Sequence, residues 1–80
     1  MATPGALATL SQAEITASIR RHHCGDWGYL CPEDREANEL ALQEGSRLFS
    51  VYYGNAGTTK FYIITEADRS VTTVLLPEEY

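Results

Sequence analysis

The residues best suited to chemistry lie before the middle of the chain, where His22, His23 and Cys24 are consecutive and Cys31 follows seven positions after Cys24. Imidazole and thiolate groups are common zinc ligands, but zinc sites usually present them as pairs separated by a few residues. Consecutive helical residues point about 100° apart, so these side chains cannot all face one ion. The pattern favours two histidines that complement the negative end of a helix and a thiol that packs as a small hydrophobe. We assign no metal ligand, and a small metal-binding protein stays as an alternative.

Cys24, an adjacent histidine and Asp26 also have the residue types of a thiol nucleophile with its general base. A reactive thiolate is stabilised at the N-terminal end of a helix, whereas Cys24 follows the expected C-terminal end of one. A chain of 80 residues also has little room for an oxyanion hole and a substrate cleft. We therefore predict that the protein is not an enzyme, that it has no catalytic residues and that it uses no cofactor.

A third group of residues lies in the expected loops, next to the ends of helices or strands. It forms the candidate binding site: Asp26, Trp27, Glu66, Asp68 and Arg69. Loops carry binding residues more often than cores do. Acidic residues in a hairpin loop also commonly hydrogen-bond to their own backbone, and Arg69 is expected to tie two loops together through a carboxylate such as Asp26. A structural role and a binding role are therefore both open for this set, although Trp27 is large enough that we expect its indole to close one end of the core.

Two helices are expected to position these groups. The capping-box sequence Ser11-Gln12-Ala13-Glu14 predicts a helix over residues 12–23, which Gly25 ends. Pro32, followed by acidic residues, predicts a second helix that runs to about residue 44. The expected inner stripes are Ile15, Ile19 and His22 in the first helix, and Ala37, Leu40 and Ala41 in the second.

Three strands, rich in β-branched and aromatic residues, are expected after these helices, over residues 48–53, 60–65 and 71–76. We predict an α+β fold in which two N-terminal helices pack on one face of a three-stranded antiparallel β-meander (ααβββ). In the middle strand, alternation places Phe61 and Ile63 on one face and Tyr62 and Ile64 on the other. Both sets are apolar, so the second face is expected to be covered by the N-terminal arm or by another chain.

Length and composition predict a single domain, residues 1–80, with one small core. Residues 1–10 are small and turn-prone and are expected to form a mobile arm, from which Leu7 and Leu10 could dock on the core. The net charge of −5, with six scattered basic residues, argues against direct binding of nucleic acid. No apolar run reaches the roughly 18–20 residues of a membrane span, and the first residues lack the positive segment of a signal peptide. We expect a soluble cytoplasmic protein with reduced cysteines and no membrane contact.

Four segments carry a resemblance to known proteins: Gly25-Asp26-Trp27-Gly28, Gly45 to Leu48, Ile64 to Ser70 and Leu75 to Tyr80. Through them nearly the whole chain resembles a family of short bacterial "plasmid-related" proteins, carried on chromosomes and mobile elements and often labelled type I restriction endonuclease subunit M. The resemblance implies no activity, because that label implies a longer protein with a cofactor-binding motif that this chain lacks. Family members have other residues at Cys24 and often at Cys31, which argues against the zinc and thiol hypotheses. The five candidate loop residues are the pattern that carries over.

Tyrosine and tryptophan are enriched at protein interfaces, and an edge strand from Phe49 to Tyr53 can pair with a strand of a partner. We therefore predict a small non-catalytic accessory or protein-interaction module that binds an unknown protein partner or associates with itself through this edge strand. The alternative is an acidic protein that mimics nucleic acid and modulates a host defence or restriction system. The mobile-element association of the family and the acidic face of the second helix suggest it, a face formed by Glu33, Glu36 and Glu39.

Overall fold

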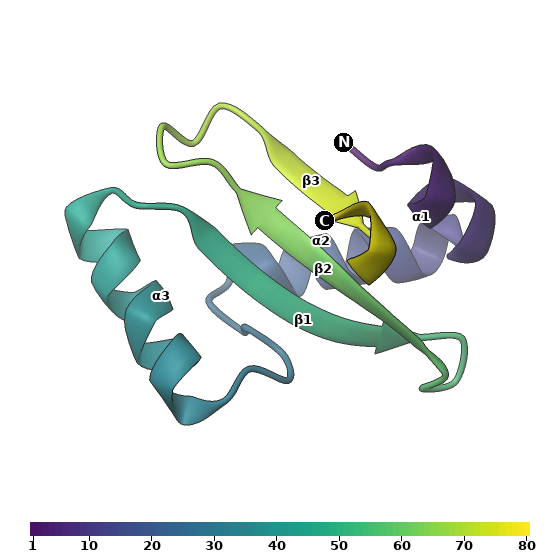
Figure 1. Cartoon of the computed structure of the whole chain (residues 1–80), viewed down its shortest axis with the longest axis horizontal. Coiled ribbons are helices and arrows are strands. Elements are labelled where there is room, and N and C mark those ends of the chain that lie inside the picture. Colours follow the sequence, from purple (N-terminus) through teal and green to yellow (C-terminus); the bar gives the residue numbers. More distant parts are fainter.

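The computed structural model describes the whole chain, residues 1–80, as three helices, a sheet and a final 3-10 turn. The elements, shown in Figure 1, are α1 (Pro4–Thr9), α2 (Gln12–His23), α3 (Pro32–Glu44), β1 (Leu48–Gly54), β2 (Thr59–Thr65), β3 (Thr72–Leu75) and η1 (Pro77–Glu79). The strands form one antiparallel sheet in the order β1-β2-β3. None of the helices has the length and apolar character that crossing a membrane requires. The predicted α+β class and the three-stranded meander are confirmed, and both predicted helices have their expected bounds.

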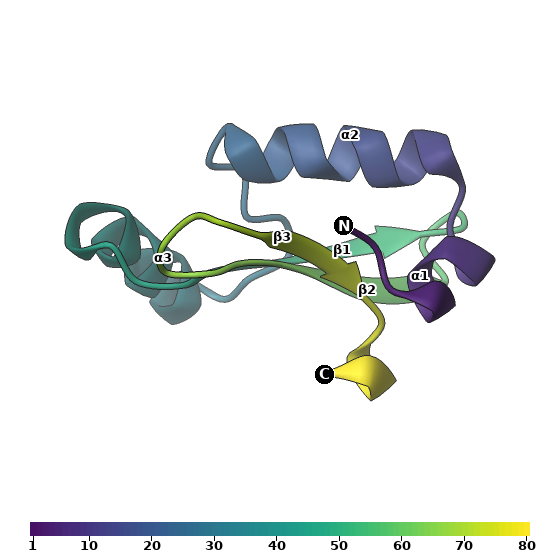
Figure 2. The same ribbon diagram turned by 90° about the horizontal axis from the view of Figure 1, so that it is seen from above.

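Helix α2 lies across one face of the sheet (Figure 2), and its sequence explains how it starts and which side it buries. The capping box forms as predicted: the Glu14 amide donates to Ser11 Oγ, and the Ser11 amide donates to the Glu14 carboxylate, both at 3.1 Å. Ile15, Ser18 and His22 are the buried residues of the helix. Their spacing of three and four places them on one stripe, which brings His22 against the sheet.

Helix α3 does not share this face, so the expectation that both helices pack on one face is wrong. It lies beside the outer edge of β1 (Figures 1 and 2). Its buried residues are Asn38 and Ala41, whereas Ala37 and Leu40, expected on the inner stripe, are exposed. The Asn38 amide group donates to the carbonyl of Phe49 at 2.5 Å and accepts from its N–H at 3.1 Å. A helix with a polar residue in its buried stripe fits a strand edge, where backbone groups need partners, better than an apolar sheet face.

The first ten residues fold against the sheet, which corrects the expectation of a mobile arm. Residues 1–3 run beside β3 and exchange backbone hydrogen bonds with it. The Thr3 side chain caps α1 by accepting from the amide of Ala6, so this short helix begins with a good N-cap followed by proline. Ala6 and Leu10, four residues apart on one side, are buried, while Leu7 on the other side is exposed.

The outer edges of the sheet are largely occupied by the chain itself. At the edge of β3, the N–H and carbonyl of Val74 are bonded to residues 1–3. At the edge of β1, the Asn38 side chain is hydrogen-bonded to both backbone groups of Phe49. The loop before α3 is hydrogen-bonded to both backbone groups of Val51, with a distance of 2.8 Å at its carbonyl and 3.3 Å at its N–H. Of the outward-facing residues of β1, only Tyr53 keeps free backbone groups. The chain's own contacts therefore occupy most of the edge that is expected to pair with a partner strand, and association through it stays a prediction.

Glycine at position 28 lets that loop approach β1. A Cβ on Gly28 would lie 2.0 Å from the carbonyl oxygen of Val51, and the residue has a φ of +72° that favours glycine. The close approach is what allows the loop to complete the edge of the strand.

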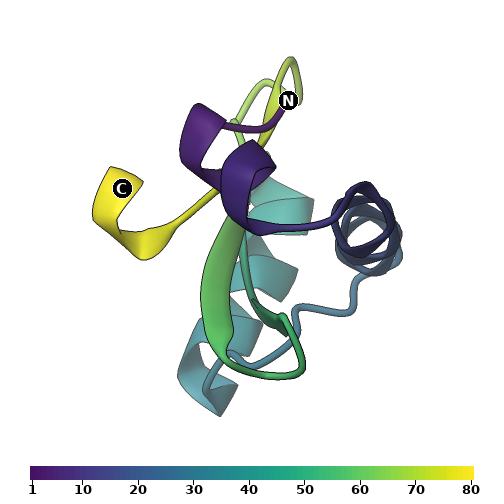
Figure 3. The same cartoon turned by 90° about the vertical axis from the view of Figure 1, so that its right-hand side faces the viewer.

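The two faces of the sheet differ in what covers them. As predicted, Phe61 and Ile63 lie on one face, under α2, where they are 1% and 0% exposed. Tyr62 and Ile64 lie on the other face, opposite α2, where the 3-10 turn η1 lies (Figure 3). The N-terminal residues, expected as one possible cover, lie instead at the β3 edge. The second face is therefore covered in part by the C-terminal residues and, on its β1 side, by Leu30 and the α3 residue Ala41, which share an apolar cluster with Val51.

Candidate functional site

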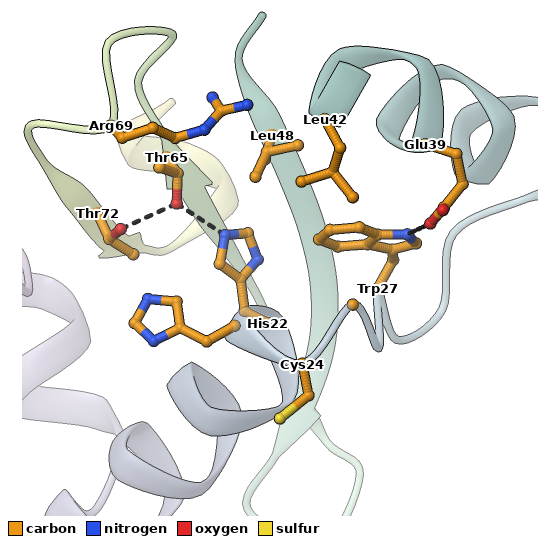
Figure 4. Close-up of a pocket in the computed structure, with 11 residues that line it drawn as sticks. His22, Cys24, Trp27, Glu39, Leu42, Leu48, Thr65, Arg69 and Thr72 are labelled. Atoms are coloured by element: carbon orange, nitrogen blue, oxygen red, sulfur yellow. Dashed lines mark hydrogen bonds between the residues drawn. The ribbon is translucent and has the colours of Figure 1, made fainter. Parts of the chain in front are cut away.

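Two surfaces of the molecule are hollowed: one beside α2, and one on the second face of the sheet. The first is the largest cavity, with a volume of about 630 Å³. It lies among the C-terminal end of α2, helix α3 and the hairpin of β2 and β3 (Figure 4). Trp27 and Arg69, two of the five residues expected to bind, are on its wall.

The inner wall of this cavity holds His22, which is only 2% exposed. Its Nδ1 is hydrogen-bonded to Ser50 Oγ, and its Nε2 lies 2.8 Å from Thr65 Oγ1. Burial, reinforced by the charge of His23, lowers the pKa of His22 from 6.5 to about 4. A neutral imidazole has one donor and one acceptor nitrogen, and hydroxyl groups can satisfy both. His22 is thus uncharged at neutral pH, so the expectation that it complements the negative end of the helix is wrong.

Trp27 closes the same end of the core, as predicted. It is 5% exposed, and its ring meets that of His22 edge to face with the centroids 5.7 Å apart. Its indole N–H donates to the Glu39 carboxylate of α3 at 2.8 Å, so the side chain ties α3 to the loop after α2. The buried N–H is therefore already satisfied.

Arg69 acts as a cap for α3. Its guanidinium donates to the carbonyl oxygens of Ala41 and Ser46, at 3.2 and 2.5 Å, and to two carbonyls of its own loop. The last turn of α3 has no basic residue, so this cation supplies the positive charge that a helix C-terminus favours. The residue has a φ of +64°, a strained value for a non-glycine residue that these hydrogen bonds hold in place. The expected link from Arg69 to Asp26 is wrong.

Asp26 pairs with a nearer cation. Its Oδ2 lies 2.7 Å from Arg21 Nε, and its Oδ1 accepts from the amide of Gly28. These hydrogen bonds, the one from Arg21 first, hold the pKa of Asp26 below its usual range. Arg21 also lies over the ring of Tyr52, 4.7 Å from the centroid. The carboxylate therefore organises the turn after α2.

The remaining two candidates have local partners. Asp68 accepts from the amide and the hydroxyl of Ser70, at 3.0 and 2.6 Å, and these bonds lower its pKa. Glu66 lies 3.6 Å from Arg47. The five candidate residues thus do not converge on one site: only Trp27 and Arg69 share a cavity, and their polar groups serve the fold.

The large cavity has few free polar groups to offer a ligand. The chain has no buried side-chain nitrogen or oxygen without a hydrogen-bond partner. Among the polar side chains that line the cavity, only those of His23 and Cys24 make no hydrogen bond, and both residues are exposed. No three His, Cys, Asp or Glu side chains are grouped so that they could hold a metal ion, and both nitrogens of His22 are engaged. Cys24 and Cys31 are exposed free thiols that line different hollows.

The second hollowed surface has the opposite character. Five aromatic side chains gather there, and we call this surface the aromatic face: Tyr29, Phe49, Tyr53, Tyr62 and Tyr80. Their rings meet in pairs with centroids 4.9 to 6.1 Å apart. Tyr29, Tyr53 and Tyr80 are 65%, 44% and 69% exposed, although each is a large side chain. Alternation along β1 and β2 places the middle three on one side in the sequence, but nothing local predicts that Tyr29 and Tyr80 join them.

Three shallow hollows of about 270, 330 and 370 Å³ adjoin one another along this face. The first and second share Leu30, Asp34 and Phe49, and the second and third share Arg47 and Tyr80. Neighbouring hollows therefore adjoin across shared walls, which include Phe49 and Tyr80, and we call the set of three the groove of the aromatic face.

Comparison with protein-family models, with curated proteins and with solved structures gives no match for this chain. The resemblance to the plasmid-related proteins stays a prediction, and the function has to be argued from the two surfaces themselves.

Proposed function

We propose that this protein is a non-catalytic interaction module that binds a protein partner through its aromatic face. The observation that carries the proposal is the gathering of five aromatic side chains, three of them well exposed, on the sheet face opposite α2. Tyrosine supplies a rigid apolar body with a polar tip, which suits a contact that must be stable when bound and hydrated when free. The two exposed free thiols support a cytoplasmic location, where cysteines stay reduced.

The contrast with the large cavity supports the same choice. There, the polar groups deep in the wall are bonded to the protein, so a ligand would gain few directed contacts. On the aromatic face, three large side chains are held partly out of the core with their ring surfaces accessible. Exposed apolar side chains that lie together, unlike those scattered singly, mark interaction surfaces.

A capture experiment tests the proposal. The tagged protein is used to capture partners from a lysate of its source cells, beside the double variant Tyr29→Ser/Tyr53→Ser and the control Leu7→Ser. Leu7 is as exposed, at 57%, but lines none of the hollows. We expect the control to retain the partner and the double variant to lose it. The double variant should keep the fluorescence spectrum of a buried Trp27, which shows that it is folded. Equal capture by both variants would contradict the proposal.

A second candidate function, mimicry of nucleic acid, rests on helix α3. Its exposed acidic residues are Glu33, Asp34, Glu36, Glu39 and Glu44. The only cation of the helix, Arg35, donates to the carbonyls of Leu30 and Gly28 and so is held at the loop. Competition with DNA for a restriction or CRISPR complex tests this candidate, and the variant Glu33→Gln/Glu36→Gln/Glu44→Gln should compete less well. Unchanged competition by that variant would remove it.

A further inference from the structure

The way the sheet edges are closed limits how an extended peptide can bind. A strand that adds to a sheet needs a row of free backbone groups at the edge. In β1 those of Phe49 and Val51 are occupied, and in β3 those of Val74 are. A polyproline II segment needs no such row, because it is recognised by grooves between aromatic side chains.

The groove on the aromatic face has the parts that this mode requires. The hollow nearest the start of α3 lies between two ring pairs, Tyr29 with Tyr53 and Phe49 with Tyr62. The next hollow lies beside the contacting rings of Phe49 and Tyr80 and is also lined by Ala37 of α3. Rings of this kind form apolar slots for pyrrolidine rings, which recur every third residue along one side of a polyproline II helix.

The tyrosine hydroxyls supply the polar half of the recognition. Those of Tyr29, Tyr53, Tyr62 and Tyr80 make no hydrogen bond within the chain, whereas the buried Tyr52 hydroxyl donates to the carbonyl of Asp26. A polyproline II segment makes no internal hydrogen bonds, so its carbonyl oxygens remain free to accept from such donors.

A free carboxylate at the junction of two hollows adds charge selectivity. Asp34 lines both the first and the second hollow and belongs to neither salt bridge of the chain. The chain also has a net charge of −5. Two cations, Lys60 and Arg47, line the same hollows, and Arg47 lies 3.6 Å from Glu66. The lining carboxylates Asp34, Glu66 and Glu79 outnumber them, so together with the net charge they favour a ligand with Lys or Arg beside its prolines over an acidic ligand.

Resting on the proposed function, we infer that the partner presents a proline-rich segment in the polyproline II conformation, flanked by a basic residue. The probe is a fluorescein-labelled synthetic peptide of about ten residues, with Pro-Pro-Leu repeats and a terminal Arg-Arg pair. We expect saturable binding in a titration to millimolar protein. Two comparison peptides replace the arginines with glutamate or replace the prolines with threonine, and both should bind more weakly.

Variants locate the binding on the groove. Tyr53→Ala should weaken the affinity by about tenfold or more, as for a central aromatic contact. Tyr53→Phe should weaken it by about threefold through the lost hydroxyl, and Asp34→Asn should weaken it by about threefold through an exposed ion pair. Leu7→Ala is the control with unchanged affinity. Tyr53 is on the surface, so these variants should fold, which Trp27 fluorescence checks.

The outcomes separate this inference from the proposed function. If the basic proline peptide does not bind while the captured partner is still lost with Tyr29→Ser/Tyr53→Ser, the ligand class is wrong and the interaction surface stands. Binding that is equal for the threonine peptide would also overturn the ligand class. If light scattering shows a dimer that Tyr53→Ala dissociates, the face binds a second copy of the chain instead. If neither peptide nor partner depends on these tyrosines, both proposals fail.

Discussion

Lowering the pH from 7 to 5 is expected to remove about 2 kcal/mol from the free energy of unfolding, through the protonation of His22. In the folded protein, burial holds the pKa of this side chain at about 4, whereas its ordinary value is 6.5. The unfolded chain therefore binds a proton at a higher pH than the folded chain does. The stability that depends on neutral His22 is fully present above pH 6.5 and is lost progressively as the pH falls towards 4, where the loss levels off.

The magnitude follows from the difference between the two pKa values. Each unit corresponds to about 1.36 kcal/mol, so the complete loss is about 3 kcal/mol, of which about 2 kcal/mol falls between pH 7 and pH 5. A domain of this size has only about 3–5 kcal/mol of net stability from its core. Hydrogen bonds in the fold lower the pKa of several carboxylates from the usual values of 3.8 and 4.5. Their protonation reduces the free energy of unfolding mainly below those values, so His22 dominates the change between pH 7 and pH 5.

The assay is urea unfolding followed by the fluorescence of Trp27, the only tryptophan, at several pH values between 5 and 7.5. His22→Gln should be less stable at pH 7, because glutamine cannot bridge both hydroxyls, but its stability should not fall between pH 7 and 5. His23→Gln, at the adjacent exposed position, should keep most of the pH-dependent loss, because burial, the larger cause of the lowered pKa of His22, remains. A loss that persists in His22→Gln, or that disappears in His23→Gln, would refute the reasoning.

Three further predictions concern contacts that position the elements, and urea unfolding measures each of them. Arg69→Gln should destabilise the protein by about 1–2 kcal/mol, because the carbonyls at the end of α3 lose a charged donor. The control Arg20→Gln changes an exposed side chain that makes no hydrogen bond and should have little effect. Equal effects of the two variants would argue against the capping role of Arg69. Asn38→Ala should lower the free energy of unfolding by about 2–3 kcal/mol, because both backbone groups of Phe49 lose their partner. The variant should also self-associate more in light scattering. A stable monomer would show that the edge of β1 does not need this cover. Gly28→Ala should cost about 2–4 kcal/mol, because its Cβ would meet a carbonyl oxygen at 2.0 Å. Gly57→Ala, at a similar φ with no atom within 4 Å, should cost only about 1 kcal/mol, and equal costs would mean that the close approach does not matter.

The candidate site was harder to predict than the fold. The local hydrogen bonds of Asp68 to Ser70 match the expectation for an acidic residue in a hairpin loop. The carbonyl groups that Arg69 binds at the end of α3 have no sequence signature. The partner of Asp26, Arg21, lies only five residues away and could have been found from the sequence, because a cation in the last turn of a helix can reach the residues that follow it. The aromatic face can be predicted from the sequence only in part, because alternation identifies its strand residues but not Tyr29 and Tyr80.

The sequence by itself determined the local elements, because short-range interactions specify them. A capping box spans four residues, a proline sets the first turn of α3, and alternation along a strand has a period of two. The tertiary structure alone decided what each element meets. His22 and Thr65 are 43 residues apart, and Arg69 and Ala41 are 28 apart, so their contacts depend on how the whole chain packs. For the same reason only the folded chain covers most of the sheet edges, lowers the pKa of His22 and leaves three tyrosines of the aromatic face exposed.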